Sequence, residues 1–149
     1  MAELTRQEII KLIATNSGDI CLQGVNLSGL DLSYLNLSRI NFAYVNLEKS
    51  NLAHAHLQET TFFRANLTGA DLSGGDLWQA EFVEANLTDV DLRQTNLTQA
   101  LMCGAILAGA NLMGSRCEGA NFDGSQATIT TVWPEDFDKG QHALIMNGD

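Results

Sequence analysis

The chain has 149 residues, a formal net charge of −10 and 45% hydrophobic residues. This length suits one domain, and the sequence holds no apolar run of the ~18 residues that a membrane span requires. The acidic balance argues against direct binding to nucleic acid or to anionic membranes, because both attract clustered lysine and arginine.

The cysteines and the N-terminal residues indicate in which cellular compartment the protein is expected. Cys21, Cys103 and Cys117 are an odd, widely spaced set, which does not resemble a disulfide framework. The N-terminal residues also lack the basic and apolar pattern of a signal peptide. We therefore expect a cytoplasmic protein.

The first segment in chain order, residues 1–19, is expected to be a helical cap. Thr5 and Glu8 have the spacing of a capping box, in which each residue bonds a free backbone N–H of the other at a helix start. The apolar residues that follow would form one face of a helix: Ile9, Ile10, Leu12 and Ile13. The sequence predicts a helix over about residues 6–15 that covers the segment after it.

The second segment, residues 20–127, repeats a word of five residues, seen clearly in "ANLTGADLSGGDL" at 65–77. Every fifth residue from Leu22 to Phe122 is apolar, and we name these the centre residues. The residue two positions before each centre is apolar or small, and the other three are mostly polar. A period of five fits neither a helix nor a strand. Each word therefore has two inward and three outward positions.

A second period is superimposed on the first. Phenylalanine recurs at every fourth centre position, with one methionine in the series: Phe42, Phe62, Phe82, Met102 and Phe122. A period of this length is typical of a solenoid, so four words would make one turn. Residues four words apart would then lie about 4.8 Å from each other, the spacing of paired strands. These five residues are predicted to form one stacked column in the core.

The words "ANLTG", "ADLSG", "ANLTD" and "ANLMG" resemble the pentapeptide-repeat family. The resemblance covers about residues 20 to 125. It implies an all-β solenoid, a right-handed quadrilateral β-helix of about five coils, with the centre residues packed along its axis.

Proline and glycine agree with a ladder that turns at corners. Pro134 is the only proline and lies outside the repeat, where it removes no ladder donor. Glycine recurs two positions after a centre, where a corner needs a positive φ: Gly24, Gly29, Gly69, Gly74, Gly104, Gly109, Gly114, Gly119 and Gly124.

The last segment, residues 128–149, leaves the five-residue pattern and is expected to be a C-terminal cap or tail. Its apolar residues could fold over the last coil: Trp133, Phe137, Leu144 and Ile145. A dimerisation segment is the alternative, since some members of the family that the repeat resembles pair through their C-termini. We favour a monomer.

The sequence offers little catalytic chemistry. It has no phosphate loop with its lysine, no zinc-protease motif and no nucleophile elbow, and a filled solenoid offers no cleft. Cys117 occupies a centre position and is expected to be buried and inert. We expect a non-enzyme with no cofactor. A metal-binding module that uses His54 and His56 is one alternative; it needs a third ligand, for which Glu59 is the nearest residue in sequence.

The outward positions suggest a protein-binding patch. On the side that carries the phenylalanine column, Phe63, Val83 and Cys103 follow the centre residues in one vertical row. Tyr44 and Leu101 lie nearby, and Trp78 projects from another side. Outward apolar residues gathered in a column are typical of an interaction surface. The sequence thus favours a structural or protein-binding role with an unknown protein partner.

The remaining alternative is an acidic mimic of DNA, because some relatives of the resembled family bind type II topoisomerases such as gyrase in that way. Five coils would span about 25 Å, over which duplex DNA carries about 15 charges. The repeat carries fewer, and they are spread over all four sides. The charge pattern therefore ranks this function below protein binding of another kind.

Overall fold

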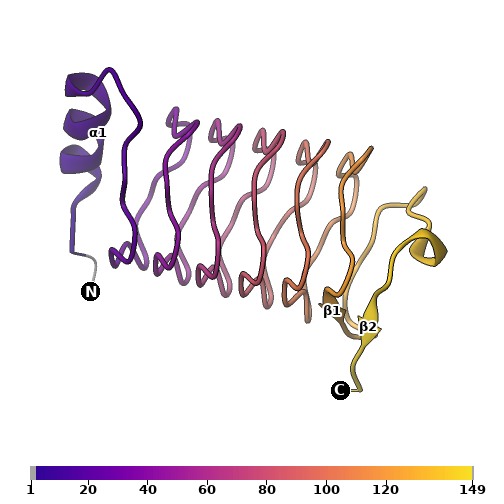
Figure 1. Ribbon diagram of the computed structural model, residues 1–149. Helices are drawn as coiled ribbons and strands as arrows, with labels where there is room; N and C mark the ends of the chain where they lie inside the picture. Colours follow the sequence, from indigo (N-terminus) through magenta and orange to yellow (C-terminus); the bar gives the residue numbers. More distant parts are fainter. Residues whose placement is uncertain (1–2, 149) are drawn as a thin grey trace.

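The computed structural model describes residues 3–148 and consists of a row of stacked coils between two different ends (Figure 1). Helix α1, Arg6–Thr15, lies at one end. Strands β1, Gln126–Ala127, and β2, Ile145–Met146, lie at the other, with the 3-10 helix η1, Lys139–Gln141, between them in sequence. The expectations for residues 1, 2 and 149 lie outside the described residues.

The coils are joined by parallel bridges between residues four words apart, from Cys21↔Asn41 to Ile106↔Gln126. On one representative side, the Leu67 N–H donates to the Asn86 carbonyl (2.8 Å), and the Asn86 N–H donates to the Ala65 carbonyl (2.9 Å). A bridge recurs once in every word, so each coil has four sides. The four-word period of the sequence is thus the repeat of the backbone ladder.

The core is a column of side chains on the axis of the coils. The centre residues from Leu22 to Leu112 are all buried, as is Phe122. The Phe62 ring stacks on Phe42, with 5.4 Å between centroids, and on Phe82, with 4.8 Å. Met102 lies next in this series and is fully buried.

The corners of the repeat place residues in the left-handed region. The glycines predicted to have positive φ do so; Gly69, for example, has φ 65°. Corner residues other than glycine have it too: Tyr34, Arg39, Tyr44, Lys49, His54, Glu59, Arg64, Gln79, Glu84, Asp89, Gln94 and Gln99. The corner, and not the glycine, therefore imposes this conformation, which costs a residue with a side chain about 1–2 kcal/mol.

The Asn or Asp before a centre stabilises the corner after it. In the word at 65–69, the Asn66 side-chain oxygen accepts hydrogen bonds from the Thr68 N–H (3.1 Å) and the Thr68 hydroxyl (2.7 Å). This is an Asx-turn, in which the side chain takes the place of a backbone acceptor. The Asn or Asp position of the repeat thus has a structural role.

Helix α1 spans the residues that the capping box and the apolar face predict. The Thr5 N–H donates to the Glu8 carboxylate (2.7 Å), and the Glu8 N–H donates to the Thr5 hydroxyl (3.3 Å). Ile9 is fully buried in the core. The Arg6 guanidinium donates to the carbonyls of Asp31 (2.6 Å) and Ser33 (3.0 Å), which belong to the first coil. Helix α1 therefore covers both the core and part of the backbone edge at this end.

Past residue 127 the chain continues the ladder irregularly. Asn111 pairs with Val132, one position later than the four-word step, whereas Gln126 in β1 pairs with Ile145 in β2, one position earlier. Between them, the Phe137 ring stacks on Trp133 (4.3 Å) and meets Phe122 edge to face (5.1 Å). Leu144 also packs against the core.

Ile145 does not fold over the last coil as expected. Its N–H donates to the Ser125 carbonyl (2.8 Å), which holds Ile145 in the backbone ladder. In this position its side chain points outward and is exposed.

Candidate functional site

The side that carries the phenylalanine column presents outward apolar residues in one row. Phe63, Val83 and Cys103 are half-buried there, and Leu101 beside them is 39% exposed. The Tyr44 ring, 47% exposed, meets Phe63 edge to face with 5.6 Å between centroids. We call these five residues the Phe-side patch.

The other sides of the repeat are more polar at the position that Phe63 occupies. The residues at that position are Ser28, Glu48, Thr68, Thr88 and Ala108 on one side; Ser33, Ala53, Ser73, Arg93 and Met113 on the next; and Ser38, Gln58, Trp78, Thr98 and Glu118 on the last. Only the phenylalanine side has an unbroken apolar row over four coils, from Ala43 to Cys103.

A charged pair borders the Phe-side patch. The Arg64 Nε donates to the Glu84 carboxylate at 2.5 Å, and the guanidinium lies 5.2 Å from the centroid of the Phe63 ring. The bond to Glu84 raises the pKa of Arg64 above its usual value. The patch thus combines apolar rings with a cation already held by an acidic neighbour.

Trp78 stands apart from the Phe-side patch. It is 36% exposed, and it lies on the side of the coil that precedes the phenylalanine side in the chain. It is therefore an exposed aromatic residue outside the patch.

The two histidines of the metal hypothesis have structural neighbours. The His54 ring stacks on Tyr34 with 5.0 Å between centroids and lies over Gly74, while His56 pairs with Asp76 in the ladder. Within residues 3–148, no three His, Cys, Asp or Glu side chains are grouped as metal ligands. A third ligand for the two histidines is thus not found among the described residues.

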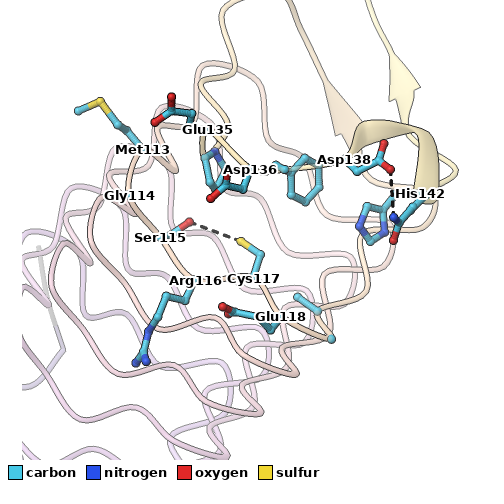
Figure 2. Close-up of a pocket in the computed structure, with 15 residues that line it drawn as sticks. Met113, Gly114, Ser115, Arg116, Cys117, Glu118, Glu135, Asp136, Asp138 and His142 are labelled. Carbon is cyan, nitrogen blue, oxygen red and sulfur yellow. Dashed lines mark hydrogen bonds between the residues drawn. The ribbon is translucent and has the colours of Figure 1, made fainter.

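A cavity at the C-terminal end was not predicted from the sequence, which led us to expect no cleft. Its volume is about 720 Å³, and it lies between residues 113–120 of the last coil and residues 134–142 (Figure 2). The charged residues that line it are Arg116, Glu118, Glu135, Asp136 and Asp138. A second cavity of about 560 Å³ lies between the end of α1 and the first coil.

Cys117 lines the C-terminal cavity, and the expectation that it is buried is wrong. It is half-buried, unlike the other centre residues, because no later coil covers it. Its thiol lies 3.5 Å from the Ser115 hydroxyl (Figure 2). Partial burial raises the pKa of Cys117, so the thiol form predominates at neutral pH.

The fold places the protein in the class of four-sided β-solenoids, with parallel backbone ladders and an apolar axial core. A family model described as pentapeptide repeats matches eight copies, in residues 20–58, 41–79, 60–99 and 91–126. These segments cover well over half of the chain. The protein therefore belongs to the pentapeptide-repeat family, as the resemblance of its words implied.

Solved structures of the same family resemble this chain. Rfr23, a pentapeptide repeat protein from the cyanobacterium Cyanothece, is 27% identical over 76% of this chain and 90% of that chain, with a TM-score of 0.48. HetL from Nostoc, involved in heterocyst differentiation regulation, is 24% identical over 89% and 78%, with a TM-score of 0.34. Trypsin-treated QnrB1, a plasmid-mediated fluoroquinolone resistance protein, is 18% identical over 85% and 82%, with a TM-score of 0.49.

A comparison with curated proteins found no match. Among the described helices, none has the length and apolar character needed to cross a membrane.

Proposed function

We propose that this protein is a non-catalytic binding module that contacts a protein partner through the Phe-side patch. The observation that supports this most is the unbroken apolar row at positions 43, 63, 83 and 103, which the other sides of the repeat lack. Solvent-exposed Tyr44 and Leu101 widen this row. Contiguous apolar surface of this kind marks protein interfaces, and aromatic residues are enriched in their centres.

The test is affinity capture with the wild-type chain and with Phe63→Asp. Phe63 is half-buried and points outward, so aspartate places a charge in the patch and leaves the core unchanged. We expect the variant to lose the partner, with a drop in affinity of about tenfold or more. Thr68→Asp is the matched control, because it lies at the same position of the word on the next side. If both variants retain the same partners, the patch is not the binding surface.

The alternative function, an acidic mimic of DNA that binds a type II topoisomerase, is favoured by the net charge of −10. However, some acidic side chains of this protein already form ion pairs or hydrogen bonds with neighbouring side chains. The Asp91 carboxylate holds the Arg93 guanidinium at 2.6 Å, and Asp76 accepts bonds from Gln58 and Asn96. A gyrase supercoiling assay tests the alternative, and no effect at micromolar protein would exclude it.

We further propose a right-handed coil of about five turns, a cytoplasmic location and a monomeric state. The handedness and the number of turns rest on the family and on the spacing of the backbone bridges. The location rests on the cysteine usage, and the monomeric state on the different structures of the two ends.

A further inference from the structure

The C-terminal segment covers the last coil unevenly. It bonds backbone groups of three words: Leu112 N–H to Val132 O (2.7 Å), Val132 N–H to Ala110 O (2.9 Å), Gly124 N–H to Ala143 O (2.9 Å) and Ile145 N–H to Ser125 O (2.8 Å). Between the first and the second of these words lies the side formed by residues 115–120. The segment passes it at a distance and encloses the C-terminal cavity instead (Figure 2).

One coil earlier, the equivalent side is fully paired. The N–H groups of Leu97 and Gln99 donate to the next coil at 2.8 and 2.9 Å, and the Thr95 carbonyl accepts from it at 2.9 Å. The equivalent groups one coil later are the Cys117 N–H, the Gly119 N–H and the Ser115 carbonyl. Within residues 3–148, no hydrogen bond engages any of the three. They form an open ladder edge of two donors and one acceptor.

Two further observations mark this side as open. Cys117 is the one centre residue of the repeat that is not fully covered, so the core itself is accessible there. The Phe137 N–H, which the register set by the Val132–Ala110 bond would direct to the Ser115 carbonyl, donates instead to the Pro134 carbonyl (3.1 Å). The chain therefore turns away from this edge without closing it.

The lining of the cavity selects the charge of an occupant. Four carboxylates, from Glu118, Glu135, Asp136 and Asp138, line it together with one guanidinium, from Arg116. Asp138 also accepts a bond from the Gly140 N–H (2.9 Å). The excess of negative charge favours a segment that carries lysine or arginine.

We propose that the open side at 115–120 binds a short extended segment of a basic protein partner by β-augmentation. Carbonyls of the segment accept from the Cys117 and Gly119 N–H groups, and one of its N–H groups donates to the Ser115 carbonyl. A small apolar side chain covers Cys117. Basic side chains on the other face meet Glu118, Glu135 and Asp136. This site lies apart from the Phe-side patch and does not depend on it.

The test uses the full chain labelled with ¹⁵N and a synthetic peptide, acetyl-Lys-Ala-Lys-Leu-Lys-Ala-Lys-amide. Its alternation places the lysines on one face and the apolar residues on the other. We expect the amide resonances of Cys117 and Gly119 to shift on titration and their hydrogen exchange to slow. The same peptide with alternate amides methylated, or with Glu in place of Lys, should bind at least about tenfold more weakly.

Protein variants distinguish the effect of the cavity's charge on peptide binding from the effect of the net charge of the whole molecule. Glu118→Lys with Asp136→Lys should weaken the lysine peptide at least about threefold. The matched control is Glu48→Lys with Asp89→Lys, which changes the net charge equally on another side of the coil. Phe63→Asp should leave peptide binding unchanged, so failure of the Phe-side patch and failure of this site are distinguishable.

Several outcomes would overturn the proposal. The glutamate or methylated peptide could bind equally well, the shifted amides could lie elsewhere, or no binding could occur at millimolar peptide. Slowed exchange at Cys117 and Gly119 that rises with protein concentration alone would assign the edge to a second copy of this chain.

Discussion

At the scale of single residues, some corner glycines provide space as well as a positive φ. At Gly74, an added Cβ would collide with the His54 ring, which stacks on Tyr34. At Gly69, an added Cβ would make only an ordinary contact of 3.5 Å with Lys49. Both glycines have nearly the same φ, 67° and 65°. The two positions therefore differ mainly in what lies beside them.

We predict that Gly74→Ala destabilises the protein more than Gly69→Ala does. Both variants bear the cost of a side chain at positive φ, about 1–2 kcal/mol. Gly74→Ala also displaces the His54 ring and its stacking on Tyr34, for a further ~0.5–1.5 kcal/mol. Urea unfolding measures the difference. In a His54→Ala background the two variants should become equal, and a persistent difference would show that the ring is not its cause.

At the scale of elements, helix α1 depends on a charge-assisted cap. The bonds from the Thr5 N–H and hydroxyl lower the pKa of Glu8 below its ordinary value of 4.5. A carboxyl whose pKa is lower in the folded state stabilises fully above its unfolded pKa, and this stabilisation is lost as the pH falls through the folded pKa. The cap is therefore sensitive to acid.

We predict that Glu8→Ala lowers the urea midpoint at pH 7 and that the gap to the wild type closes as the pH falls below about 4. Unfolding followed by circular dichroism at several pH values provides the measurement. Glu118→Ala, at the other end of the molecule, is the control and should show no such closing gap. A gap that persists unchanged at pH 2 would rule out the carboxylate as the cause.

The elements differ in how far the sequence predicts them. The bounds of α1 follow from the sequence because its cap, Thr5 and Glu8, and its apolar face are local. The ladder follows because no insertion interrupts the words between Leu22 and Phe122. The path after residue 127 does not follow, since Val132 and β2 pair through backbone atoms that any residue supplies. No side-chain pattern marks where the ladder step lengthens or shortens by a single position.

The candidate sites also differ in how far the sequence predicts them. The row through Phe63 and Val83 can be read from the sequence, because the word assigns each residue a side of the coil. The C-terminal cavity cannot, because the centre position of Cys117 predicts burial only when another coil follows. Whether one follows depends on the route of residues 134–142, which Pro134 redirects. The position of a residue in the word thus predicts its direction, and its exposure depends on the neighbouring coil.

At the scale of the whole molecule, several large apolar residues are exposed in the C-terminal segment. The residues exposed there are Ile129, Val132, Ile145 and Met146. They belong to one incomplete coil, and β2 has only two residues. A stable dimer buries about 800 Å² on each partner, more than a few separate side chains supply.

We therefore predict a monomer of 16.2 kDa in sedimentation velocity at micromolar concentration. The wild type and Ile145→Lys should sediment alike, since lysine at this exposed position leaves the core untouched. A sedimentation coefficient that rises with concentration in the wild type and not in Ile145→Lys would instead assign a dimer interface to the C-terminal segment.

The change from a uniform four-word step to one longer and one shorter step has a consequence for assembly. A coil of strictly uniform period would have ends that match, and head-to-tail addition of further copies would generate a filament. Here one edge is bonded by Glu3 and Arg6, and the other is shifted out of register by the residues around Ile129. The two ends do not present matching ladders, which disfavours head-to-tail growth and agrees with the monomer that we predict.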